Sequence, residues 1–122
     1  MIKINKDVPL DERGQNANIK FHVLDKETMN SYGFGYTYER WLFNVGLTDT
    51  ISMNIAISDD GEGLIDILDD DFLQPYDFQS VIINNGNNAP TIAKITQKKV
   101  YEIMEGLVYS GIISGWNVGD YI

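Results

Sequence analysis

The strongest constraint in this sequence is a run of alternating side chains near its centre. Isoleucine or methionine occupies every second position from Ile51 to Ile57, and smaller or polar residues occupy the positions between them. A strand with one buried face has this period of two, because successive side chains point to opposite faces of a sheet. The same alternation returns at Ile65 and Ile67, after a turn over residues 59–63. The sequence therefore predicts a β-hairpin.

The length of the turn determines which side chains share the buried face of this hairpin. A two-residue loop formed by Asp60 and Gly61 would set Ile55 opposite Asp66 and bury a carboxylate. A three-residue loop that ends at a left-handed Gly61 sets Ile55 opposite Ile65 instead, and a five-residue loop preserves the same parity. Burial of an unpaired carboxylate costs several kcal/mol, which exceeds the preference among turn types. We therefore expect a loop with an odd number of residues.

On the outer face of the hairpin, this register places Asp66 opposite Asn54. Leu64 and Leu68 share that face, so it is not a purely polar surface. Apolar side chains on an outer face are compatible with a homodimer, because symmetric pairs are the commonest oligomers.

Acidic residues gather around the same hairpin. The chain has 18 Asp and Glu against 9 Lys and Arg, a net charge of −9, and no basic residue lies between Trp41 and Ala93. Charge of this sign disfavours binding to a phosphate backbone and favours a basic protein partner. The predicted partner-binding residues are Asp59, Asp60, Glu62, Asp66, Asp69, Asp70 and Asp71.

The N-terminal part of the chain carries weaker signals. Residues 18–24 alternate as in a strand. The predicted inward side chains are Ile19, Phe21 and Val23, and the outward ones are Lys20, His22 and Leu24. Residues 1–5 predict a short edge strand, and residues 6–17 predict a polar loop. Residues 25–31 predict a turn or a single helical turn.

Aromatic side chains are concentrated in residues 32–43, where Tyr32, Phe34, Tyr36 and Tyr38 fall on one face of an extended strand. These four residues occupy even positions, whereas the next two, Trp41 and Phe43, occupy odd positions. This change indicates a bulge or a strand break near Glu39 and Arg40. One aromatic face on a strand is typical of a hydrophobic core. It is also compatible with a platform for a small ligand or a sugar ring.

Two helices are expected after Asp71. The first is predicted to begin at Pro75, which suits the first helical position, and to end at Gly86. The second has Thr96 as its predicted N-cap and Gly111 as its terminator. A start near Pro90 would move Lys98 and Lys99 away from the helix N-terminus, but the β-branched residues over 91–96 argue against it. Its apolar stripe consists of Val100, Ile103, Met104, Leu107 and Val108.

These patterns predict an α+β fold for residues 1–122 as a single domain. We expect an antiparallel sheet of four to five strands with a central meander, packed on one face by two helices, of which the C-terminal one is longer. The chain has no apolar run long enough to span a membrane, and its N-terminus lacks the apolar core of a signal peptide, so a cytoplasmic location is the default expectation.

Several kinds of chemistry are disfavoured by composition. The absence of cysteine excludes disulfides, thiolate metal sites and thiol nucleophiles. Asp59, Asp60, Glu62 and Asp66 lack the spacing of an EF-hand loop, so no metal and no cofactor is predicted. His22 is the only histidine and belongs to no catalytic motif. A hydrolase based on carboxylates is therefore the least favoured function, and no catalytic residue is assigned.

The leading hypothesis is a small acidic protein that acts as a protein–protein interaction module. Its partner would be basic, and the module would serve as an inhibitor or immunity factor, or as a mimic of nucleic acid. The alternative is a small-ligand or sugar-binding domain that uses the aromatic residues over 32–43.

Overall fold

The computed structural model describes residues 19–120 and 122. The strand expected over residues 1–5 and the loop expected over residues 6–17 lie outside this described part. The strands are β1 (Lys20–Phe21), β2 (Gly35–Thr37), β3 (Arg40–Gly46), β4 (Ile51–Ser58), β5 (Gly63–Asp69), β6 (Gln74–Pro75) and β7 (Ile113–Ser114). The helices are α2 (Lys26–Tyr32), α3 (Phe78–Asn85) and α4 (Thr91–Ser110), with a 3₁₀ turn η1 at Gly86–Asn88.

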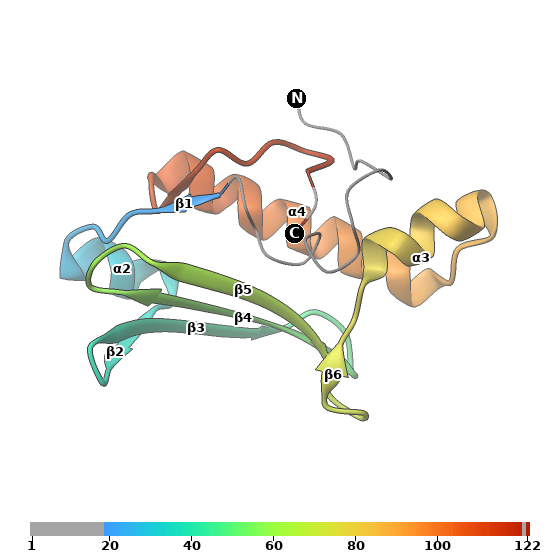
Figure 1. Cartoon of the computed structure of the whole chain (residues 1–122), viewed down its shortest axis with the longest axis horizontal. Helices are drawn as coiled ribbons and strands as arrows, with labels where there is room; N and C mark the ends of the chain where they lie inside the picture. The colour runs from blue at the N-terminus through green and yellow to red at the C-terminus, as the bar shows by residue number, and fades with distance from the viewer. Residues whose placement is uncertain (1–18, 121) are drawn as a thin grey trace.

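The main sheet is an antiparallel meander. Its five strands lie in the order β2-β3-β4-β5-β6, and β1 pairs with β7 in a separate two-stranded sheet. The long helix α4 runs across one side of the main sheet (Figure 1). The predicted α+β class, the antiparallel sheet and the long C-terminal helix are confirmed, and α2 is an additional helix that precedes the sheet.

The β4–β5 hairpin has the predicted register. Ile55 lies opposite Ile65. The backbone N–H of Ser58 donates to the carbonyl of Glu62 at 2.8 Å, which leaves a three-residue loop between them. Gly61 has a φ of +88°, as this loop requires. The alternating isoleucines therefore point toward the helix-covered side, where Ile55 and Ile57 are at most 1% exposed.

Residues 32–38 do not form the single extended strand that the sequence predicts. Asp25 caps α2 by accepting a hydrogen bond from the backbone N–H of Thr28 at 3.0 Å, and Tyr32 is the last residue of that helix. Tyr38 and Glu39 have φ values of +50° and +64° and form the turn between β2 and β3. The expected break near Glu39 and Arg40 is thus present as a tight turn. Of the first four aromatic residues, Tyr32 lies on α2 and Tyr36 on β2. Phe34 lies between these two elements and Tyr38 in the turn after β2, so the four do not share one strand face.

Both predicted helix starts were wrong. Pro75 lies in the edge strand β6, where a missing N–H is tolerated, and Asp77 is the N-cap of α3. The helix α4 begins after Pro90, five residues before the predicted N-cap Thr96. Thr96 is buried within the helix, and its hydroxyl donates to the carbonyl of Ile92 at 2.7 Å, which satisfies the polar group locally. Gly111 ends α4 as predicted, with a φ of +86°.

The core lies between the sheet and α4. Val100, Met104 and Leu107 form one face of α4 and are 0% exposed. Gly106 on the same helix leaves space for Tyr32, whose hydroxyl donates to the carbonyl of Ile103 at 3.1 Å. None of the helices in the described part of the chain has the length and apolar character that crossing a bilayer requires.

Candidate functional site

All the predicted acidic residues except Asp66, which lies within β5, are divided between the two ends of the β4–β5 hairpin. Asp59, Asp60 and Glu62 lie at the tip, whereas residues 69–71 lie where the chain leaves β5. A strand of 7 residues such as β5 is about 20 Å long at ~3.3 Å per residue. The structure therefore does not bring all seven carboxylates into one cluster.

The carboxylates at the exit of β5 hold the local backbone. Asp69 accepts hydrogen bonds from the backbone N–H groups of Asp71 and Phe72 at 3.1 and 3.4 Å. Asp70 accepts a hydrogen bond from the hydroxyl of Ser52 at 2.7 Å. These contacts stabilise the turn into β6 and give Asp69 and Asp70 a structural role.

Asp66 lies on the face of the sheet that points away from the helices. It pairs with Asn54 across the β4–β5 ladder, and the side-chain amide of Asn44 donates to the side-chain oxygen of Asn54. The next row of cross-strand neighbours on this face is apolar and consists of Leu42, Ala56 and Leu64. In it, Leu42 and Leu64 are 38% and 47% exposed. Asp66 is thus part of a mixed surface and is separate from the tip.

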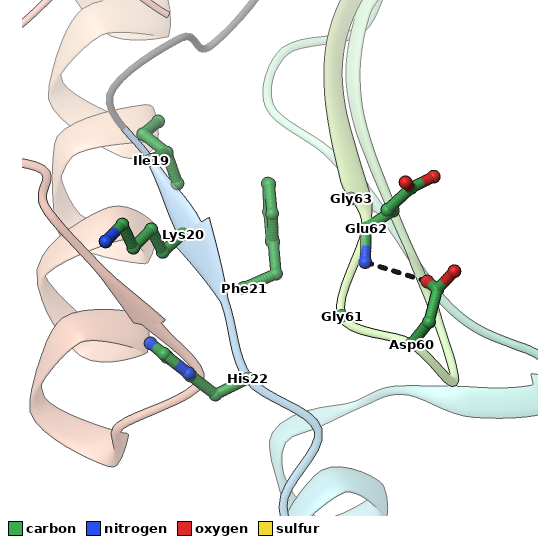
Figure 2. A pocket seen from close by; sticks show the side chains of 8 residues that line it. All are labelled: Ile19, Lys20, Phe21, His22, Asp60, Gly61, Glu62 and Gly63. Carbon is green, nitrogen blue, oxygen red and sulfur yellow. Dashed lines mark hydrogen bonds between the residues drawn. The ribbon is translucent and has the colours of Figure 1, made fainter.

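The carboxylates of the tip are exposed but held in place. Asp60 accepts hydrogen bonds from the hydroxyl of Ser58 and, at 3.1 Å, from the backbone N–H of Glu62 (Figure 2). The Ser58 hydroxyl, followed by this N–H group, lowers the pKa of Asp60 from its ordinary value. Asp59 accepts a hydrogen bond from the Tyr36 hydroxyl at 2.7 Å. Two of the three tip carboxylates therefore have defined orientations.

A pocket lies between the hairpin tip and α2. It has a volume of about 650 Å³ and is lined by Val23, Lys26, Asn30, Tyr36, Trp41 and Asp59. The Tyr36 and Trp41 rings are 4.9 Å apart between centroids, at an interplanar angle of 55°. Lys26 and Asn30 are four residues apart on α2 and so face the same side of that helix. The pocket thus combines an aromatic pair with a cation, an amide and a carboxylate.

A second pocket, of about 550 Å³, lies on the other side of the tip, between it and β1 (Figure 2). The ring of Phe21 points toward Gly63, where an added Cβ would lie 2.4 Å from the ring. Lys20 and His22 point away from Phe21 (Figure 2). His22 Nε2 is 2.8 Å from the hydroxyl oxygen of Ser114, so this histidine links β1 to β7.

Among residues 19–120 and 122, no group of three or more histidine or acidic side chains is placed to hold a metal ion.

Sequence reasoning missed the contribution of α2 to the pocket. The sequence predicts only a turn or a single helical turn over residues 25–31, which include Lys26 and Asn30. A helix of 7 residues carries little periodicity, but Asp25 followed by Thr28 is compatible with an N-cap and was the available signal.

Comparison with known proteins provides no relative of this chain. No protein-family model, no curated protein and no solved structure matches it.

Proposed function

We propose that this chain is a protein–protein interaction module that binds a basic partner through the tip of the β4–β5 hairpin. The observation that carries the proposal is the set of exposed carboxylates of Asp59, Asp60 and Glu62 on a three-residue loop. Two of them are fixed by hydrogen bonds before any partner arrives. Groups that are already ordered lose little conformational entropy on binding, which favours affinity.

The charge distribution supports a basic partner in particular. A segment without Lys or Arg extends from Leu42 to Ala93, and the tip lies within it. Surface potential of one sign steers a partner of opposite sign and raises its association rate. The lowered pKa of Asp60 extends the ionised form of this carboxylate to lower pH. An inhibitor or immunity factor of a basic enzyme, or a mimic of the phosphates that such an enzyme binds, is the form of function that we propose.

The small-ligand alternative has weaker support. Of the aromatic residues over 32–43, only Tyr36 and Trp41 line the pocket, and Phe34 is 2% exposed. Tyr38 is 89% exposed but does not line the pocket, so two aromatic rings rather than a continuous aromatic surface are available there.

A capture experiment with matched variants tests the proposal. The bait is the full chain, its tip variant Asp59→Asn/Asp60→Asn/Glu62→Gln, or a control variant Asp49→Asn/Glu102→Gln/Glu105→Gln. Both variants lose the same charge, and the control acids are exposed in the β3–β4 turn and on α4, away from the tip. We expect the wild-type chain and the control to retain a basic protein from host lysate, and the tip variant to lose it.

The salt dependence of the captured protein is the second readout. Raising the ionic strength from about 0.1 M to about 1 M shortens the Debye length from about 10 Å to about 3 Å, so capture should decline. Equal retention by the tip variant, retention that salt does not reduce, or retention of no basic protein would contradict the proposal.

A further inference from the structure

We infer that the pocket between α2 and the hairpin tip holds an arginine side chain of the basic partner. The guanidinium would pair with the Asp59 carboxylate and lie against the rings of Tyr36 and Trp41. This inference rests on the proposed function and identifies the chemical group that the tip recognises.

The carboxylate of Asp59 is the first part of this site. Its Oδ2 accepts the hydrogen bond from the Tyr36 hydroxyl, and the side chain is exposed at the mouth of the pocket. A carboxylate has about four acceptor positions, so one hydrogen bond leaves it free to accept from a guanidinium. Arginine pairs with carboxylates through two parallel N–H···O bonds, which a fixed carboxylate orientation favours.

The aromatic pair is the second part. Tyr36 is 49% exposed and Trp41 is 6% exposed, and both line the same pocket as Asp59. A planar guanidinium stacks on aromatic rings and is attracted by their electron-rich faces, whereas a lysine ammonium is a strongly hydrated point charge. The combination of a carboxylate with two aromatic rings therefore favours arginine over lysine.

The other polar residues of the pocket determine whether a cation or an anion is preferred. Lys26 is a like charge for arginine and would attract an anion. Asp59 lines the pocket itself, and Asp60 and Glu62 lie on the same loop, so negative charge exceeds positive charge at this end of the hairpin. The side-chain oxygen of Asn30 offers a further acceptor for guanidinium N–H groups. A cationic occupant is consequently favoured, and Lys26 should weaken its binding.

The sign of the Lys26 effect makes the inference testable. The probe is an acetylated and amidated Gly-Arg-Gly peptide, and its control is the same peptide with citrulline, which has the same shape but no charge. Binding is followed through the fluorescence of Trp41 in a Trp116→Phe background, since the chain has 2 tryptophans and Trp116 packs on Tyr101 outside the pocket. Calorimetric titration of the unsubstituted chain with both peptides provides a second measurement.

We expect saturable binding of the arginine peptide and at least about tenfold weaker binding of the citrulline peptide, as for loss of a charge-assisted pair. Asp59→Asn should weaken binding of the arginine peptide by a similar factor. Lys26→Gln should strengthen binding of the arginine peptide about two- to threefold, which is the scale of an exposed charge interaction. Lys98→Gln, an equal charge change on an exposed part of α4, should have no effect.

Three results would overturn the inference: equal binding of the arginine and citrulline peptides, weaker binding in Lys26→Gln, or no binding of either peptide. A neutral sugar that changes Trp41 emission where the arginine peptide does not would instead assign the pocket to a carbohydrate. If capture from lysate depends on the tip while the two peptides bind alike, the proposed function stands and the arginine pocket fails. If the peptides behave as expected but capture does not depend on the tip, the proposed function fails separately.

Discussion

The Tyr36 hydroxyl donates a hydrogen bond of 2.7 Å to the carboxylate of Asp59, across 23 positions of sequence. This contact joins the β2 edge of the sheet to the tip of the β4–β5 hairpin. It links the two features that the sequence presents separately, the aromatic stretch and the acidic hairpin.

The first prediction concerns the pKa of Tyr36. The hydrogen bond to Asp59, with smaller contributions from desolvation and from the charges of Asp59 and Glu39, raises this pKa above 10.0. Asp59→Asn should lower it toward 10.0, because the amide is a weaker and uncharged acceptor. NMR titration of tyrosine ring carbons measures the change, and Asp66→Asn is the charge-matched control that leaves Tyr36 untouched.

The same shift determines how Tyr36 affects stability at high pH. Since the folded-state pKa lies above that of the unfolded chain, the contribution of the contact is fully present below about pH 10. It is lost as the pH rises through the folded-state pKa. Tyr36→Phe should therefore reduce the alkaline dependence of the unfolding free energy, and an unchanged dependence would contradict this assignment.

The second prediction concerns Asp60 and acid. The Ser58 hydroxyl, then the Glu62 backbone N–H, hold the pKa of Asp60 below 3.8. Ser58→Ala should raise this pKa toward 3.8, whereas Ser58→Thr retains a hydroxyl and should change it less. The depressed pKa provides stability that is present above about pH 3.8 and lost as the pH falls through the folded-state value. Carboxylate NMR titration of the wild-type chain and the two variants measures the order of their Asp60 pKa values.

The third prediction concerns the contact between β1 and β5. A Cβ at Gly63 would lie 2.4 Å from the ring of Phe21, so Gly63→Ala forces that ring to move. We expect a loss of about 1–3 kcal/mol in the free energy of unfolding. Gly35→Ala is the matched control, since nothing lies within 4 Å of its added Cβ. Urea unfolding of both variants measures the difference, and equal stabilities would show that Phe21 moves without cost.

The fourth prediction concerns Gly106 and Tyr32. A Cβ at Gly106 would lie 2.3 Å from the Tyr32 hydroxyl oxygen but 3.4 Å from the nearest ring carbon. Gly106→Ala should therefore destabilise the wild-type chain by displacing the hydroxyl from the Ile103 carbonyl. In a Tyr32→Phe background the same substitution should stabilise by about 0.5–1 kcal/mol, because alanine has the higher helix propensity. A double-mutant cycle from urea unfolding would show that the effect of Gly106→Ala on the free energy of unfolding changes sign between the two backgrounds.

The parts of the fold that could be predicted are those set by local sequence. The β4–β5 register follows from alternation together with the cost of burying Asp66, and both are visible within about twenty residues. The ends of α3 and α4 follow from Gly86 and Gly111, because glycine readily adopts the conformations that terminate helices.

The missed features depend on unusual conformations or distant contacts. The β2–β3 turn places Tyr38 and Glu39 at positive φ, where asparagine or glycine is the usual signal, so the sequence indicates a bulge or a strand break there but not a tight turn. The pocket requires α2, β2, β3 and the hairpin tip to meet, and no local pattern contains that information. The start of α4 at Thr91 shows packing overriding the weak helix propensity of β-branched residues.

The three-residue loop at the hairpin tip also limits how the tip can vary. Adding or removing one residue there would rotate every side chain of β5 to the opposite side of the sheet, carrying Asp66 into the core and Ile65 out to solvent. Replacing Asp59 and Asp60 in place leaves the ladder intact, whereas the φ of +88° at Gly61 favours glycine at that position. New binding specificities can therefore arise at this tip by exchange of side chains, while its length can change only by even numbers of residues.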